Sequence, residues 1–297
     1  MREPIGVIGL GLMGGAFARH LAAADFTVSG FDPDTTAAAR AEAAGVSIAR
    51  DGAALAADAR LVLTSLPSVE AADFVIAELC SGFREPGGII AEMSTLPLAH
   101  KLRLADVAAA AGHILLDCPV SGTGAQAQTG DIVLYASGDA DGIARLRPFA
   151  SAFSRQLIEL GEVGNGTRVK LVANLLVAIH NVAAAEAMLL GMRAGLDPQR
   201  LVEVIAAGAA TSRVFELRAP MMAADRFLPA TMKLDVWAKD LAAIAELACE
   251  SGTATPLFDR TIPLYAAATE AAPGLDTAAV LRTIAALEPS SSKRSNS

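Results

Sequence analysis

Residues 5–14 read Ile5-Gly6-Val7-Ile8-Gly9-Leu10-Gly11-Leu12-Met13-Gly14. The apolar start is typical of a buried strand, and it leads directly into the pattern G-x-G-x-x-G at the start of a predicted helix. In such a turn Gly9 permits the sharp change of direction, Gly11 leaves room for a pyrophosphate, and Gly14 lets the helix pack closely on the strand. The stretch therefore predicts a nucleotide cofactor site at a helix N-terminus, where free N–H groups favour phosphate.

A carboxylate follows at the distance that dinucleotide binding requires. The next predicted strand, residues 27–31, leads into Asp32, eighteen residues after Gly14. A carboxylate there accepts hydrogen bonds from both hydroxyls of an adenosine ribose and repels a 2′-phosphate. We therefore expect NAD as the cofactor in preference to NADP.

Composition and charge exclude several classes of protein. The chain has 297 residues, enough for two domains, and its net charge of −8 without a basic stripe argues against a nucleic-acid partner. The most apolar segment, residues 171–192, is interrupted by polar side chains such as Asn174 and His180, so we expect no membrane span. Three scattered cysteines and no signal-like segment predict a cytoplasmic protein with free thiols and no metal site.

Strand-like and helix-like segments alternate in the first half of the chain, which indicates βαβ units and a mainly parallel sheet. From Thr167 to Arg193 the pattern is one long helix, and the remainder also reads as helical. Strands are predicted near residues 5–9, 27–31, 61–66, 88–93, 114–120, 132–136 and 156–160, and later helices near 199–207, 213–224, 234–251, 256–270 and 276–287.

These patterns predict an α/β fold in which a long helix joins an N-terminal Rossmann-type domain to a C-terminal all-α domain. We place the first domain at residues 1–163, the second, for substrate binding and oligomerisation, at 164–288, and a disordered tail at 289–297. The long helix is apolar on all sides, which a single small bundle covers poorly. We therefore expect a homodimer or homotetramer.

Ligands of open α/β sheets bind beyond the carboxyl ends of the strands, so the residues that follow each strand are candidates. Leu66-Pro67 offers an apolar turn for a cofactor ring, and Ser94-Thr95 offers a hydroxyl to the nicotinamide ribose; an ordinary turn and a helix cap are the alternatives. Ser121-Gly122-Thr123-Gly124 supplies hydroxyl and N–H groups that can bind a carboxylate, although a flexible surface loop has a similar composition.

Lys170 is the strongest candidate for proton transfer. It falls in the first turn of the predicted long helix, directly after a glycine-rich segment between two domains, where clefts tend to form. On a helix, Asn174 and Asn181 lie within about 40° of the Lys170 direction, so a cation and two amides share one stripe. A solvated surface lysine is the alternative, and it is also the alternative for a second candidate, Lys239.

Together these motifs resemble the β-hydroxyacid dehydrogenase family, which includes 3-hydroxyisobutyrate dehydrogenase and tartronate semialdehyde reductase. The resemblance runs from Gly9 to Lys239-Asp240, through Asp117-Cys118-Pro119-Val120-Ser121-Gly122 and Gly164-Asn165-Gly166-Thr167-Arg168-Val169-Lys170. It implies a hydride transfer between NAD and a short β-hydroxyacid or semialdehyde, with Lys170 as proton donor or acceptor. It also implies that Ser121, Gly122 and Asn174, with Thr123 in the same loop, bind a small carboxylate substrate, and that Thr95 and Lys239 approach the cofactor.

Two positions depart from the family's pattern. Thr123 stands where a second glycine is usual, and Ala173 stands where an asparagine usually precedes Asn174. Both lie on the substrate side, so they leave the identity of the hydroxyacid open. An imine reductase of the same fold is one alternative, although imine reductases generally lack the lysine, and a non-catalytic NAD-binding sensor or interaction protein is another.

Overall fold

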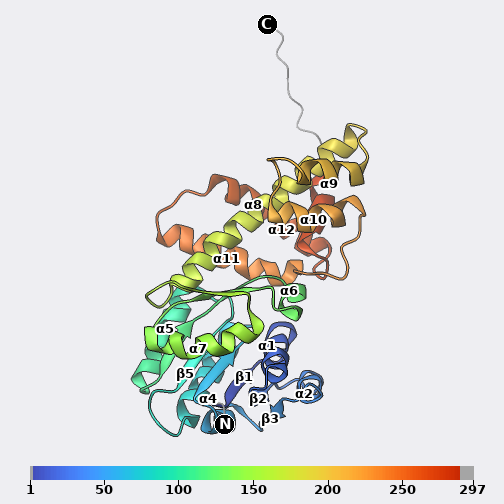
Figure 1. Cartoon of the computed structure of the whole chain (residues 1–297). Coiled ribbons are helices and arrows are strands. Elements are labelled where there is room, and N and C mark those ends of the chain that lie inside the picture. The colour runs from blue at the N-terminus through green and yellow to red at the C-terminus, as the bar shows by residue number, and fades with distance from the viewer. Residues whose placement is uncertain (1–2, 288–297) are drawn as a thin grey trace. The chain divides into compact units, whose positions relative to one another are not determined.

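The computed structural model describes residues 3–287 and shows two compact units, which divide in sequence between Val172 and Ala173 (Figure 1). The first unit is built from alternating strands and helices and the second from helices, which confirms the predicted fold class. The division falls inside the long helix, whereas the predicted domain boundary lies at residue 163, before that helix begins. The predicted disordered tail, residues 289–297, lies outside the described residues.

A parallel six-stranded sheet forms the centre of the first unit. Its strands are β1 (Ile5–Ile8), β2 (Val28–Phe31), β3 (Ser47–Ile48), β4 (Leu61–Thr64), β5 (Ile89–Glu92) and β6 (Ile114–Asp117). They lie in the order β3-β2-β1-β4-β5-β6, so the direction of winding reverses between β1 and β4. Because each connection crosses over through a helix, the carboxyl ends of the strands share one edge of the sheet, where such folds bind ligands.

Helices cover both faces of this sheet. They are α1 (Leu12–Ala23), α2 (Thr35–Glu42), α3 (Gly52–Asp58), α4 (Val69–Gly82), α5 (Leu98–Ala110) and α7 (Ala140–Phe153), and the short helix α6 (Gly124–Gln128) packs on α1. Val7 packs in one apolar core with Phe17 of α1 and Phe153 of α7, whereas its neighbour Ile8 packs in a second core with Ile76 of α4. Burial on both faces explains why the strands read as continuous apolar runs.

A second, smaller sheet corrects the sequence prediction. β7 (Val120–Ser121) pairs antiparallel with β8 (Val133–Ala136), which pairs parallel with β9 (Gln156–Glu159). The single strand predicted over residues 114–120 is therefore wrong. It breaks at Cys118-Pro119, because proline has no N–H to donate and the backbone of Asp117 pairs with Ser137.

The long helix α8 runs over Asn165–Arg193 and so starts two residues earlier than predicted. By length and composition it could cross a membrane. Within the second unit, however, the buried Asn181 amide donates hydrogen bonds of 2.9 Å to the Tyr265 hydroxyl and to the Thr277 carbonyl. Hydrogen bonds from a buried side chain to other parts of the same domain are characteristic of a core helix in a globular domain.

The rest of the second unit consists of short and medium-length helices. They are α9 (Pro198–Ala206), α10 (Arg213–Ala223), α11 (Leu234–Glu250), α12 (Pro256–Ala271), the 3-10 helix η1 (Thr277–Ala279) and α13 (Val280–Ala285). Arg218 and Asp276 form a buried ion pair at 2.8 Å, and the backbone N–H of Thr231 also donates to Asp276. The pair ties α10 to the start of η1, and Thr231 ties the segment that leads into α11 to the same carboxylate.

Candidate functional site

The glycine-rich turn has the geometry that a dinucleotide requires. Gly9 has a φ of +85°, and a Cβ there would lie 2.1 Å from the Ser65 carbonyl oxygen. A Cβ on Gly14 would lie 1.9 Å from the Gly9 carbonyl oxygen, so Gly14 permits the close contact between helix and strand. A Cβ on Gly11 would meet nothing within 4 Å. Gly11 is also the N-cap of α1 and supplies no side-chain cap, so a pyrophosphate can approach these N–H groups.

Asp32 lies directly beside this turn. Its Oδ2 accepts a hydrogen bond of 2.7 Å from the Leu10 N–H, and its Oδ1 accepts one of 2.8 Å from the Asp34 N–H. Each carboxylate oxygen keeps a lone pair that can accept a hydrogen bond from a ribose hydroxyl. Asp34 caps α2 through the Thr36 N–H and adds a second negative charge after β2. The residues therefore fit NAD.

The turns after β4 and β5 are joined to each other. The Ser94 hydroxyl oxygen accepts a hydrogen bond of 2.7 Å from the Leu66 N–H, and both residues are buried. This bond fixes Leu66-Pro67 and Thr95, the predicted cofactor contacts, at the same edge of the sheet as the glycine-rich turn.

The predicted substrate loop begins in β7. Gly122 has a φ of +150°, and a Cβ there would lie 2.7 Å from Ile132 Cγ2, so a side chain does not fit. Thr123 has a φ of −93° and forms a capping box with Gln126 at the start of α6. This role explains how a threonine can stand where the family usually has glycine. Because the cap engages its hydroxyl, a substrate contact of Thr123 stays a prediction.

The start of α8 is attached to the carboxyl end of β6. The Asp117 carboxylate accepts hydrogen bonds from the Thr167 N–H at 2.7 Å and the Thr167 hydroxyl at 2.8 Å. The Gly166 N–H donates to the Ser137 hydroxyl oxygen at 2.9 Å. The sequence predicted that Lys170 lies in the first turn of the long helix. Because α8 begins at Asn165, Lys170 lies in its second turn instead. Lys170 thus follows within one turn of the anchored residues.

Asn174 and Lys239 belong to the second unit. Asn174 is buried, and its Nδ2 donates a hydrogen bond of 3.0 Å to Asp240 Oδ2 on α11. Lys239, the neighbour of Asp240, is exposed. The second amide of the predicted stripe, Asn181, is engaged in the helical core and has a structural role.

Sequence reasoning missed a buried cluster of charges in the first unit. Glu92 and Asp117 face each other in register at the ends of β5 and β6, and Lys101 of α5 contacts both. The acids were visible in the sequence as the polar residues that end two apolar strands. Lys101 gave no signal, because a lysine in a helix is usually exposed.

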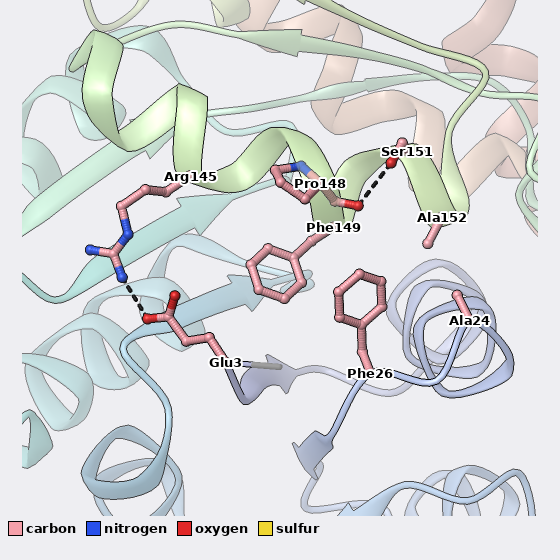
Figure 2. A pocket seen from close by; sticks show the side chains of 8 residues that line it. All are labelled: Glu3, Ala24, Phe26, Arg145, Pro148, Phe149, Ser151 and Ala152. Atoms are coloured by element: carbon pink, nitrogen blue, oxygen red, sulfur yellow. Dashed lines mark hydrogen bonds and ion pairs between the residues drawn. The ribbon is translucent and has the colours of Figure 1, made fainter. Parts of the chain in front are cut away.

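A cavity of about 790 Å³ lies away from the carboxyl edge of the parallel sheet (Figure 2). Its lining comes from Glu3 before β1, from Phe26 before β2 and from α7, so it lies at the amino ends of the first two strands. Figure 2 shows the ion pair that joins Glu3 to Arg145. The rings of Phe26 and Phe149 pack against each other, with centroids 4.9 Å apart. The cavity contains none of the predicted site residues.

Comparisons with known proteins cover nearly the whole chain. The family model for the NAD binding domain of 6-phosphogluconate dehydrogenase matches residues 4–161. A second model, described as NAD-binding of NADP-dependent 3-hydroxyisobutyrate dehydrogenase, matches residues 164–284. L-threonate dehydrogenase from Cupriavidus necator is 32% identical over 293 residues, which cover 97% of this chain and 98% of that protein. NAD-dependent L-serine dehydrogenase from Pseudomonas aeruginosa is 29% identical over a region that covers 89% of this chain and 91% of that protein.

Solved structures show the same similarity. Mycobacterium tuberculosis 3-hydroxyisobutyrate dehydrogenase with L-serine superposes with a TM-score of 0.88 at 28% identity, covering 96% of this chain and 99% of that chain. An imine reductase from Pseudomonas sp. has a TM-score of 0.65 at 18% identity, covering 96% of this chain and 100% of that chain, and so shares the fold alone. The imine reductase alternative is therefore less favoured than a hydroxyacid dehydrogenase.

Proposed function

Since the chain belongs to the β-hydroxyacid dehydrogenase family, we propose that Lys170 is the general acid and base of its reaction. The protein is an NAD-dependent oxidoreductase that acts on the CH–OH group of a small hydroxyacid. The observation that carries the role of Lys170 is the anchoring of Thr167 on Asp117. It ties the helix that carries the lysine to the sheet edge where Rossmann folds bind their cofactor.

The chemistry divides between the cofactor and the protein. Bound NAD supplies the acceptor or donor of a hydride. During oxidation Lys170 Nζ takes the proton of the substrate hydroxyl, and during reduction the ammonium polarises the carbonyl oxygen and returns the proton. Lys170 must therefore exchange its proton at working pH.

The remaining site residues have binding roles in this proposal. The Ser121 hydroxyl and the Gly122 N–H donate hydrogen bonds to the substrate carboxylate, and Asn174 orients the substrate. The glycine-rich turn, Asp32, Leu66, Pro67, Thr95 and Lys239 contact the cofactor. The substrates named for the relatives, threonate, serine and 3-hydroxyisobutyrate, share a short carboxylate with a hydroxyl group, which supports this class of substrate for the chain.

A turnover assay tests the function directly. The absorbance of NADH is followed after the protein is mixed with NAD and with each member of a panel of short hydroxyacids. The panel includes L-serine, L-threonate and 3-hydroxyisobutyrate. Reduction of NAD by at least one of them supports the proposal. Tight NAD binding without turnover of any hydroxyacid, or of any matching semialdehyde with NADH, would favour the non-catalytic sensor.

We also propose a homo-oligomer, a dimer or a tetramer, formed through the second unit. Leu176 and Leu190 of α8 are 49% and 72% exposed, and α9 buries none of its residues although it carries Val204. Apolar surface of this kind is characteristic of subunit interfaces. Light scattering at micromolar concentration should give at least the mass of a dimer, and a monomer would contradict the proposal.

A cytoplasmic location is part of the same proposal. Cys80, Cys118 and Cys249 are all free thiols, as is usual in a reducing compartment. Fractionation of cells that express the protein tests this location, and recovery in the membrane fraction would contradict it.

A further inference from the structure

Three charged side chains are completely buried together at the carboxyl edge of the large sheet. Lys101, Glu92 and Asp117 are each 0% exposed. Lys101 Nζ donates to Asp117 Oδ1 at 2.9 Å and to the Glu92 carbonyl oxygen at 3.0 Å, and it forms an ion pair with the Glu92 carboxylate. Two carboxylates at paired positions of neighbouring strands repel each other, and the ammonium that contacts both of them offsets this repulsion.

Each carboxylate also holds one part of the proposed site. Glu92 Oε1 accepts the Ser94 N–H at 3.0 Å, and Ser94 in turn accepts the Leu66 N–H. Glu92 therefore fixes the turn that carries Thr95. Asp117 accepts both hydrogen bonds of Thr167 and one from the Ser137 hydroxyl, and so fixes the start of the helix that carries Lys170.

Stability alone does not account for this arrangement. Buried ion pairs are often no more stabilising than apolar side chains of the same volume. Burial, the largest influence, lowers the pKa of Lys101, but the charges of Asp117 and Glu92 outweigh it and raise the pKa above its ordinary value. The ammonium is therefore the stable form of Lys101 at neutral pH.

We propose that Lys101 is a positioning residue that fixes the Thr95 turn and the Lys170 helix at one separation. Through Glu92 it holds the turn of Thr95, the proposed cofactor contact. Through Asp117 it holds the start of the helix that carries Lys170, the proposed proton donor and acceptor. The inference rests on the proposed function of Lys170. Small errors in such a separation matter, because a misplacement of about 1 Å can lower a rate by about 10²-fold.

The test compares Lys101→Met with the double variant Lys101→Met/Glu92→Gln. The single variant leaves two carboxylates without their cation and is expected to lose stability. The double variant also removes the negative charge of Glu92, while the glutamine oxygen can still accept the Ser94 N–H. Its melting temperature should therefore be higher than that of the single variant. Its kcat should still fall by about 10- to 100-fold, while the KM for the hydroxyacid changes by less than about threefold, since Lys101 does not hold the Ser121 loop.

Hydrogen exchange supplies a second readout that does not depend on activity. The backbone amides of Gly166 and Thr167, at the start of α8, donate hydrogen bonds to the side chains of Ser137 and Asp117. In the absence of NAD, both amides should exchange faster in the double variant than in the wild type. Arg218→Met is the matched control, because it breaks a buried ion pair with Asp276 in the second unit. It should leave these two amides unchanged.

Three results would overturn the inference. One is a double variant that keeps more than half of the wild-type kcat, another is unchanged exchange of the two amides, and the third is an equal increase in the Arg218→Met control. If the double variant does not fold, Lys101→Gln, which keeps a hydrogen-bond donor, takes its place under the same criteria. A Lys170→Met variant that kept its kcat would instead refute the proposed function, while the exchange of the two amides would still report on Lys101.

Discussion

The carboxylate of Asp117 accepts two hydrogen bonds from Thr167, one from its N–H at 2.7 Å and one from its hydroxyl at 2.8 Å. Asp117 ends the last strand of the parallel sheet, and Thr167 lies in the first turn of α8. A negative side chain at a helix N-terminus is stabilised by the helix dipole as well as by its hydrogen bonds. The relationship thus connects the nucleotide-binding sheet with the helix of Lys170 through one buried contact.

Thr167→Val keeps the volume and the N–H of this residue but removes its hydroxyl. The lost hydrogen bond goes to a charged acceptor, so the free energy of unfolding should fall by about 1.5–3 kcal/mol. Urea denaturation followed by circular dichroism measures the change. Thr261→Val is the control, because its buried hydroxyl donates to a neutral carbonyl oxygen, that of Phe258, and its loss should cost only about 0.5–1.5 kcal/mol. Equal losses would show that the charge of Asp117 adds nothing.

We expect the preference for NAD over NADP to depend on Asp32. Because its carboxylate repels a 2′-phosphate, kcat/KM should favour NAD over NADP by at least about tenfold, which corresponds to about 1.4 kcal/mol. Asp32→Ala should reduce this ratio, whereas Asp51→Ala, which removes an acidic helix cap at α3, should leave it unchanged. Equal or better use of NADP by the wild type would refute the preference. It would then point to Arg40, which lines a cavity of about 350 Å³ beside Gly11.

Ser121→Ala tests the substrate loop. Loss of one hydrogen bond to a charged carboxylate, about 1.5–3 kcal/mol, should raise KM by about 10- to 100-fold with a smaller effect on kcat. Steady-state kinetics with a confirmed hydroxyacid gives both values. Ser151→Ala on α7, whose exposed hydroxyl donates to the Pro148 carbonyl, is the control. An unchanged KM in Ser121→Ala would remove this residue from the site.

The cysteines should differ in reactivity. Burial raises the pKa of the Cys118 thiol, so its thiolate, the reactive form, is scarce in the folded protein even at alkaline pH. Cys249 is exposed. A thiol reagent at pH 8 should therefore modify Cys249 quickly and leave Cys118 intact until the protein is unfolded. Mass spectrometry of the modified peptides identifies each site, and rapid native modification of Cys118 would contradict its burial.

The sequence allowed much of the fold to be predicted, because the strands are short apolar runs between helices and the cofactor turn depends on glycines close together in the chain. The strand predicted over 114–120 failed at Pro119, where loss of one N–H outweighed the continuing apolar pattern. The cap formed by Thr123 and Gln126 could have been predicted, since this spacing is a known helix start.

The buried charges were beyond prediction from the sequence. That Glu92 lies opposite Asp117 depends on the register of two strands, and that Lys101 points inward depends on how α5 packs on the sheet. Neither follows from residue spacing along the chain. For the same reason sequence reasoning identified the cofactor turn more completely than the contacts that hold the start of α8.

The role of Lys170 is tested most directly by the kcat of Lys170→Met with NAD and a confirmed hydroxyacid, under conditions where a substrate deuterium isotope effect shows that hydride transfer limits the rate. Methionine keeps the length of the side chain and removes the proton donor, so kcat should fall by about 10² to 10⁴-fold while the Kd for NAD stays nearly unchanged. A variant that keeps more than about a tenth of the wild-type kcat would contradict the assignment of Lys170.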